Sequence, residues 1–278
     1  MAGLSPKRNT PSRAARAASQ SARGLSREPL TFYRTPLPGI DCSELLHGKL
    51  IVIEGPDAVG RSTQVQRLRP WLEELGHAVL DTGMARSALA GKGIRQAKEG
   101  NTLGPITMTL FYLTDFADRL ENEIIPALRA GFVVLTDRYI FSIMARAIAR
   151  GESRSWIERT AGFALVPHLV LYLKADVPQL LSRVVIGKGA FDYWESGMDL
   201  NFGQDMYDSF VKYQSRLIRV FDQLAKPYGF QVVDASRTAD EVFETLKESI
   251  SRMFEPAAAV SPARKPVAQA RDRSASAD

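Results

Sequence analysis

The sequence predicts an α/β fold in which a five-stranded parallel sheet carries helices on both faces. Apolar segments of strand length alternate with helical segments throughout residues 46–255. Each apolar segment is short, continuous and bounded by turn residues, which is typical of strands buried on both faces of a parallel sheet. The chain has 278 residues, of which 45% are hydrophobic, and this is enough for one such core.

The elements follow one another in a regular order. A strand at residues 50–55 leads into a helix at 62–75, where apolar residues recur at helical spacing until Gly76 ends it. A second strand at 78–83 precedes one long helical region at 103–129. The other strands are expected at residues 132–137, 168–174 and 230–235. The other helices are expected at residues 139–150, 177–185, 206–225 and 238–254.

Two basic tails flank this body. Residues 1–40 contain seven arginines and lysines and one glutamate, and residues 256–278 contain four basic and two acidic residues. Both ends are poor in large apolar side chains, so they bury too little surface to order themselves. We expect disordered tails at 1–45 and 256–278 around one domain at 46–255. The alternatives are weak nucleic-acid contact or an organelle transit peptide; no specific nucleic-acid partner is expected.

Composition also excludes several classes of protein. No apolar run approaches the about 18 residues that a membrane-spanning helix needs, so no membrane partner is expected. Cys42 is the only cysteine, which rules out an internal disulfide and indicates a reducing compartment, and we expect a cytoplasmic protein. The three histidines stand apart and there is no Cys-x-x-Cys, so no zinc site is expected.

The turn after the first strand reads IVIEGPDAVGRSTQ, which matches the phosphate-binding pattern G-x-x-x-x-G-K-[ST] at every position but one. Gly55 and Gly60 let the backbone curl so that its N–H groups face phosphate oxygens. The helix that follows adds its positive N-terminal end, and the hydroxyl of Ser62, beside Thr63, is a candidate Mg²⁺ ligand. Arg61 replaces the lysine of the pattern; it keeps the charge, but its guanidinium is longer and planar.

The third strand ends in Asp137-Arg138-Tyr139, which a parallel sheet puts beside the phosphate loop. An aspartate there can hold Mg²⁺ through water, and an arginine there can clamp a second phosphate. The alternative is that Asp137 caps the next helix and Arg138 is solvated. The neighbouring phosphate loop favours the binding interpretation.

With these motifs in place, residues 49–254 resemble the thymidylate kinase family of P-loop nucleoside monophosphate kinases. The matching segments read IVIEGPDAVGRSTQ, MARS, DRYIFS, PHLVLYL, DYWE and VVDAS. The distinctive features are Asp57, two positions after the first loop glycine, and the DRY followed by Ser142. The resemblance implies the three-layer P-loop NTPase fold, dependence on ATP and Mg²⁺, phosphorylation of dTMP to dTDP, and a homodimer.

The resemblance also implies an acceptor site. Asp57 would contact the sugar 3′-hydroxyl, Arg86 and Arg138 would hold the acceptor phosphate from two sides, and Tyr112 would stack on the pyrimidine. The full set of implied substrate-binding residues is Asp57, Arg86, Tyr112, Phe116, Arg119, Arg138 and Ser142.

This acceptor site departs from the family pattern. Phe116 stands where the family usually has a base-reading arginine. Tyr112, Phe116 and Arg119 share one helical face, so Arg119 can restore the contact from one turn further on. The alternative is that both aromatics are core residues and that Arg119 is a solvated neighbour of Asp115 or Glu123. Arg146-Ala147 replaces a Tyr-Gln pair that encloses the base in one branch.

On the donor side, the resemblance implies a lid at residues 187–205 and ATP contacts near the last strand. The implied ATP-binding residues are Gly55, Ala58, Gly60, Arg61, Ser62, Thr63, Ala235 and Arg237, and the implied metal ligands are Ser62 and Asp137. Ala58 and Tyr193 occupy the positions where the family has its catalytic arginine. The catalytic candidates that remain are Arg61, Asp137, Arg183 and Lys188.

Three functions are open at this point. The first is an ATP- and Mg²⁺-dependent kinase that acts on small nucleotide substrates, with dTMP as the acceptor. The second is a related P-loop kinase with another acceptor, which the altered base-reading positions suggest. The third is a nucleotide-binding regulatory module with little turnover, which the loss of the loop lysine and lid arginine suggests.

Overall fold

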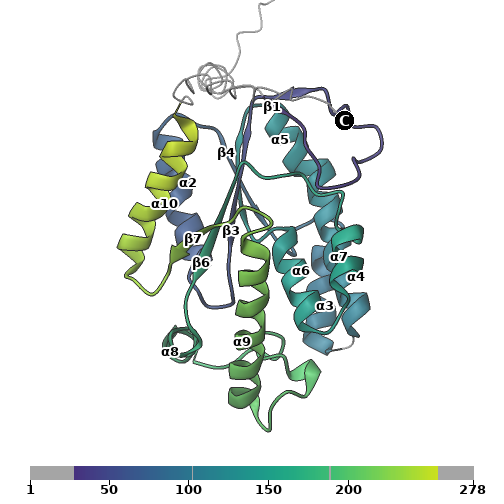
Figure 1. The fold of residues 1–278 in the computed structure, drawn as a ribbon, viewed down its shortest axis with the longest axis vertical. Coiled ribbons are helices and arrows are strands. Elements are labelled where there is room, and N and C mark those ends of the chain that lie inside the picture. Colours follow the sequence, from purple (N-terminus) through teal and green to yellow (C-terminus); the bar gives the residue numbers. More distant parts are fainter. Residues whose placement is uncertain (1–27, 102, 188, 256–278) are drawn as a thin grey trace, which may run out of the picture.

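The computed structural model describes residues 28–101, 103–187 and 189–255. Its centre is a parallel sheet with the strand order β4-β5-β3-β6-β7, so the predicted fold is confirmed (Figure 1). The strands are β3 (Lys49–Glu54), β4 (Val79–Gly83), β5 (Val133–Asp137), β6 (Leu169–Lys174) and β7 (Gln231–Asp234). Ile53 near the end of β3 pairs with Asp137 at the end of β5, so the segments that follow these strands lie side by side.

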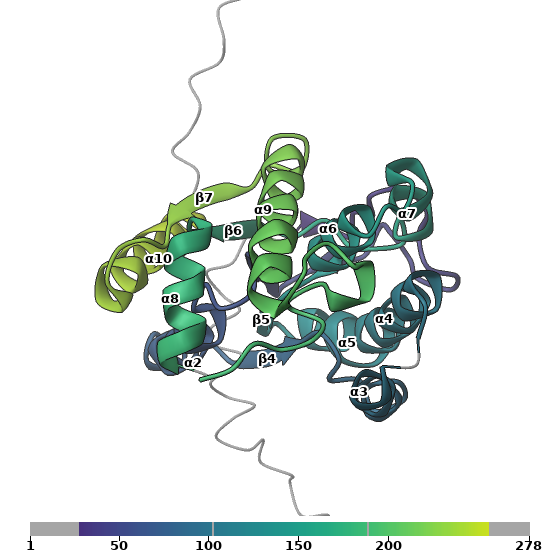
Figure 2. The same ribbon diagram turned by 90° about the horizontal axis from the view of Figure 1, so that it is seen from below.

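Alternate side chains of the central strand cover opposite faces of the sheet. Ile51 and Ile53 pack with α2, α8 and α10, whereas Leu50 and Val52 pack with α4, α6 and α9. Figure 2 shows the first set of helices on one side of the strands and α4 and α6 on the other. The helices are α2 (Arg61–Glu74), α4 (Pro105–Arg119), α6 (Ile140–Ala149), α8 (Val177–Gly187), α9 (Met206–Ala225) and α10 (Ala239–Phe254).

The long helical region expected at 103–129 is present but not uniform. It consists of α4, a π-helical turn η1 (Leu120–Ile124) and α5 (Ile125–Arg129). Pro126 follows the π turn, and a proline removes one N–H donor and pushes away the carbonyl of the preceding turn. The wider turn keeps the chain helical across the proline.

Short elements escaped prediction from sequence. These are α3 (Gly91–Gly100), α7 (Arg154–Thr160), η2 (Met198–Leu200) and the paired strands β1 (Glu28–Pro29) and β2 (Leu45–Leu46). Most of them span too few residues to show a clear apolar period, and α3, although it has ten residues, contains Ile94 as its only large apolar side chain. Within the part of the chain that the structure describes, no helix combines the length and the apolar character needed to cross a membrane.

The tail boundary expected at residue 45 needs correction. β1 and β2 pair, Leu30 and Leu37 are buried, and the ring of Tyr33 packs on Phe141 and Tyr228 at 6.0 and 5.2 Å. Prolines at positions 29, 36 and 38 argue against a regular helix or strand here, yet each of these apolar side chains reaches the core on the α6 side of the sheet. The rest of the expected tails, 1–27 and 256–278, lies outside the described residues.

Candidate active site

The turn from β3 into α2 forms a phosphate cradle. Gly55 has a φ of 149°, and a Cβ added there would lie 2.5 Å from the carbonyl oxygen of Leu173, so only glycine fits. Gly60, with a φ of 99°, precedes α2, and no side chain of the described residues caps this helix end. The first-turn N–H groups of α2 are therefore available to an anion.

Arg61 opens α2 and turns its guanidinium into this loop. Nη1 donates to the carbonyl oxygens of Gly55, at 2.7 Å, and of Pro56, while Nε donates to Oδ1 of Asp137 at 2.9 Å. The residue is only 7% exposed. The cation that replaces the lysine of the motif thus lies inside the cradle.

Asp137, at the end of β5, joins the cradle to the neighbouring strand. Its Oδ2 accepts a 2.7 Å hydrogen bond from Ser62 Oγ, while Oδ1 pairs with Arg61. Burial raises the pKa of the Asp137 carboxyl, but Arg61 and Arg138 outweigh burial and hold this pKa below its usual range. An ionised carboxylate and a hydroxyl therefore stand side by side, which is a donor set that suits Mg²⁺.

Asp57 lies in the loop and is almost fully buried among cations. Nη2 of Arg138 donates to Oδ1 at 2.5 Å, and Nη2 of Arg146 donates to both carboxylate oxygens at 2.7 and 2.9 Å. Gln214 Nε2 donates to Oδ2 at 3.3 Å. Burial raises the pKa of Asp57, but Arg146 and then Arg138 more than offset burial and keep this pKa well below its usual range.

Arg138 is held in an unusual backbone conformation by Glu54. Its backbone φ angle is 72°, which is uncommon for a residue other than glycine. Fully buried Glu54 accepts from the N–H groups of Tyr139 and Ser142 and from Ser142 Oγ, and Ser142 Oγ in turn accepts from Arg138 Nη1 at 3.1 Å. Burial and then the nearby Arg61 lower the pKa of Arg138 to about 10, and burial raises that of Glu54.

Arg86 reaches the same site from the segment after β4. Oδ2 and Oδ1 of Asp115 accept from the N–H groups of Ala85 and Ser87 at 2.9 and 2.8 Å, which fixes the backbone on both sides of Arg86. The Arg86 side chain is about half exposed and pairs with Asp81 at 3.1 Å. It is therefore positioned by its backbone and remains accessible to a ligand.

The structure corrects the expectation for Phe116 and Arg119. Phe116 is fully buried and packs on Tyr139 and Phe163 at 4.9 and 5.6 Å. Arg119 is also buried, and its Nε pairs with Asp115 at 3.0 Å. Both side chains lie in the core, where Nε of Arg119 supports Asp115 and its buried Nη1 and Nη2 have no hydrogen-bond partner among the described residues.

Tyr112, on the same helix α4, is 8% exposed and lines a small cavity of about 20 Å³. The other walls come from α4, from α6 and from the segment between α8 and α9. They are formed by Met108, Thr109, Ile143, Arg146, Arg150 and Trp194. The stacking role of Tyr112 stays a prediction.

The donor side of the loop opens into a second cavity of about 470 Å³ between the cradle and α10, lined among others by Ala235 and Arg237. Arg183, on α8, donates to the carbonyl oxygens of Val59 and Ala235 at 2.9 and 2.6 Å, and so connects the loop to the segment after β7. Lys188, the other expected lid cation, lies outside the described residues.

The segment expected to form a lid over the donor phosphates contacts the acceptor side of the site. Trp194 is buried, and its Nε1 donates to the carbonyl oxygen of Lys98 on α3. Arg150 on α6 pairs with Asp199 at 2.9 Å and also donates to Tyr213 on α9. These contacts hold the segment between α8 and α9 against the acceptor side, because its aromatic side chains find their packing partners there.

A single cavity of about 360 Å³ unites these parts. Phosphate-loop residues form one wall and Arg86, Arg138 and Arg183 contribute cations, with Asp57, Asp137 and Glu195 as the acidic groups. The residues predicted to bind the donor and acceptor phosphates therefore line one cavity, whereas Tyr112 and the pair Ala235 and Arg237 line neighbouring ones.

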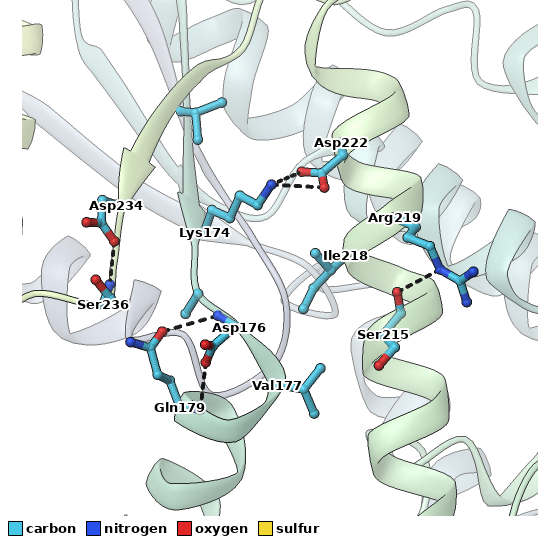
Figure 3. A pocket seen from close by; sticks show the side chains of 12 residues that line it. Lys174, Asp176, Val177, Gln179, Ser215, Ile218, Arg219, Asp222, Asp234 and Ser236 are labelled. Carbon is cyan, nitrogen blue, oxygen red and sulfur yellow. Dashed lines mark hydrogen bonds and ion pairs between the residues drawn. The ribbon is translucent and has the colours of Figure 1, made fainter.

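A larger cavity, about 960 Å³, lies elsewhere, between the ends of β6 and β7 and helix α9 (Figure 3). Its charged groups largely pair with one another: Lys174 Nζ lies 2.9 Å from Oδ2 of Asp222, and Asp176 and Gln179 exchange hydrogen bonds at the start of α8. It has no phosphate loop, so it is not the candidate active site.

The parallel sheet, the glycine loop between β3 and α2, and the arginines that face it define a P-loop phosphotransferase. The family model for thymidylate kinase matches residues 53–246. Among related proteins, probable thymidylate kinase 2 of Saccharolobus solfataricus is 34% identical over 198 residues, which cover 71% of this chain and 92% of the relative. Thymidylate kinase of Clavibacter michiganensis is 32% identical over 210 residues, 72% and 93% of the two chains. The chain belongs to the thymidylate kinase family.

Several residues of the site were given no binding role from the sequence. Arg146, noted only as a departure from the family pattern, binds Asp57 together with Gln214. Glu54 fixes the turn that carries Arg138, and Asp115 fixes the segment of Arg86. Glu54 directly precedes the loop motif, and this position could have marked it as a residue of the site. Gln214 lies 157 residues from Asp57, and nothing local marks it.

Proposed function

We propose that the protein transfers the γ-phosphoryl group of ATP to the 5′-phosphate of dTMP, giving dTDP and ADP. The observation that carries this proposal is the shared 360 Å³ cavity, which puts the phosphate loop opposite Arg86 and Arg138. A phosphoryl transfer needs two phosphates in line and cations around both, and it needs no nucleophilic side chain. An acceptor-phosphate oxygen attacks the γ-phosphorus, and the bridging oxygen leaves with ADP.

On the acceptor side, we assign the phosphate to Arg86 and Arg138. All four lone-pair directions of the Asp57 carboxylate have partners, two of which come from Arg146. When Arg138 turns to the acceptor phosphate, it vacates one position on Oδ1. The sugar 3′-hydroxyl can then donate there, while Arg146 and Gln214 keep the carboxylate charge balanced.

On the donor side, we assign the polyphosphate to the loop amides between Gly55 and Thr63, with Ala58 at the turn. The Arg61 guanidinium bonds to the loop and to Asp137 through Nη1 and Nε, and its Nη2 makes no hydrogen bond with the described residues. We therefore expect Arg61 to be the cation that reaches the transferring phosphoryl group. Arg183 supports the loop from its outer side. Ala235 and Arg237 line the adjoining cavity, which we assign to the adenosine part of ATP.

The residues present also fit a Mg²⁺ ion. Ser62 Oγ and Asp137 Oδ2 supply two oxygens 2.7 Å apart. Among the described residues, no three acidic, histidine or cysteine side chains lie close enough together to hold a metal ion by themselves. Mg²⁺ is commonly held by one or two protein groups together with substrate phosphates, so this small set is sufficient. The bound ion would neutralise phosphate charge.

We further propose a homodimer in a reducing, cytoplasmic environment. Exposed Ile106 and Leu110 lie one turn apart on α4, and exposed Leu89 lies in the segment before α3. Together these apolar side chains offer a face for a second copy. Sedimentation at micromolar concentration tests the dimer: a single species at monomer mass contradicts it.

A coupled ADP-release assay across dTMP, dUMP, dCMP, dGMP and free nucleosides tests the function. Turnover that is fastest with dTMP supports the proposal. Turnover with a different acceptor only points to a related kinase. Tight ATP binding without turnover on any acceptor points to a nucleotide-binding regulatory module, because Arg61 would then remain bonded to the loop carbonyls.

A further inference from the structure

The small cavity beside Tyr112 is lined by the guanidinium of Arg146, to which neither substrate has been assigned. Arg146 projects from α6 and lines this cavity while it also contacts Asp57. It therefore connects the assigned sugar and phosphate region with a mostly apolar pocket formed by α4, α6 and Trp194. A nucleotide bound at Asp57 with its base in this pocket would pass directly over Arg146.

The hydrogen bonds of Arg146 leave part of its guanidinium unused. Both bonds to Asp57 come from a single nitrogen, Nη2. Its Nε is fully buried and has no partner among the described residues. A buried donor without a partner is destabilising, and native proteins retain such groups mainly where a ligand or water completes them.

Charge balance alone does not explain this arrangement. Asp57 is already bonded to Arg138 and Gln214, and an arginine that only neutralised it would pair through two nitrogens in the bidentate manner. Arg150, which lines the same cavity, shows how a fully bonded arginine looks there. All three of its side-chain nitrogens have partners, on Asp199, Tyr213 and Trp194.

The cavity volume of about 20 Å³ holds roughly one water molecule. A pyrimidine ring enters only when one wall moves back. Trp194 is on the segment between α8 and α9. This segment is held here by Arg150 and the carbonyl oxygen of Lys98, and on the α9 side by Ser209 and Gln214. Movement of this wall would open the pocket between Tyr112 and Arg146.

We propose that Arg146 recognises the base of the acceptor nucleotide by donating a hydrogen bond to one of its carbonyl oxygens. Arginine has donors and no acceptor, so it favours a base edge with a carbonyl over one with an amino group. Where that oxygen is O4, Arg146 also disfavours cytosine, which carries an amino group at C4 but shares the C2 carbonyl with thymine and uracil. This inference rests on the proposed function. It assigns the base contact to α6 because Arg146 lines the small cavity, whereas Phe116 and Arg119 line neither this cavity nor the phosphate cavity, although Arg119 also has buried nitrogens without a partner.

The test uses dTMP and two analogues, one without the 2-oxo group and one without the 4-oxo group. For the wild-type protein, removal of one of the two groups lowers kcat/KM by roughly 10- to 100-fold, as expected for a lost base contact. For Arg146→Met, that penalty largely disappears. The control Arg150→Met alters the same wall but retains the wild-type penalty.

The inference is overturned if Arg146→Met, shown by its melting curve to be folded, discriminates among the three nucleotides as the wild-type protein does. If this variant does not fold, Arg146→Gln replaces it under the same criterion, since its one amide nitrogen can still donate to Asp57 but leaves no second donor nitrogen for the base. If the wild-type protein lacks kinase activity, the proposed function fails separately. Calorimetric affinities for the same nucleotides then decide the role of Arg146.

Discussion

Replacement of Asp57 by asparagine removes the negative charge that two buried guanidiniums share. Arg138 and Arg146 both bind this carboxylate, and its side chain is 2% exposed. Loss of one partner from a buried ion pair typically costs about 3 to 5 kcal/mol, because the remaining charge has no compensation. The asparagine oxygen still accepts hydrogen bonds, so we expect a loss near the lower end, about 3 kcal/mol at pH 7.

The pH dependence gives this prediction its sign. Asp57 has a folded-state pKa below its ordinary value, so its stabilising contribution is complete above the unfolded pKa, about 3.9, and is lost as the pH falls below it. The wild-type protein should therefore lose stability in acid more steeply than Asp57→Asn. The difference between the two proteins should be largest at neutral pH and should shrink near pH 3.

Urea denaturation at pH 7 and pH 3 measures both quantities. Asp81→Asn is the matched control, because its partner Arg86 is half exposed and such pairs contribute about 0 to 1 kcal/mol. The reasoning is refuted if Asp57→Asn is as stable as the wild-type protein at pH 7. It is also refuted if the difference between them is the same at both pH values.

Three further changes probe the site. Arg61→Ala should lower kcat for dTMP by roughly 10³-fold, and Arg61→Lys should lower it by at least about tenfold, because an ammonium cannot match the contacts to Asp137 and two loop carbonyls. Steady-state kinetics measure both effects, and unchanged rates would remove Arg61 from the mechanism. Arg86→Ala should raise KM for dTMP at least about tenfold with little change in melting temperature, and an unchanged KM contradicts its phosphate role. Chelation by EDTA should abolish turnover and excess Mg²⁺ should restore it, whereas full activity in EDTA would exclude the ion.

Much of the fold was predictable because each strand is a short apolar run and each long helix shows a clear period. The phosphate loop was predictable because its glycines, Ser62 and the strand before it are contiguous in sequence. The end of β5 could be assigned to the same site because parallel neighbours bring their carboxyl ends to one edge.

The acceptor half was harder to predict because its contacts cross the chain. Arg119 shares a helical face with Tyr112 by spacing, but the carboxylate of Asp115 one turn away draws it into the core. Arg146 lies 89 residues from Asp57, and Trp194 meets Lys98 across 96 residues. No local pattern encodes such pairs, since they depend on how α3, α6 and the segment before α9 pack together.

The most direct test of the central claim is a single-turnover reaction of the protein with γ-labelled ATP, Mg²⁺ and dTMP, followed by rapid quenching. If Arg61 serves a working phosphate loop, the label appears in dTDP at a rate that Arg61→Ala reduces strongly. If one ATP binds per chain and no label reaches dTDP, or if the label is transferred equally fast without the Arg61 guanidinium, the account is contradicted.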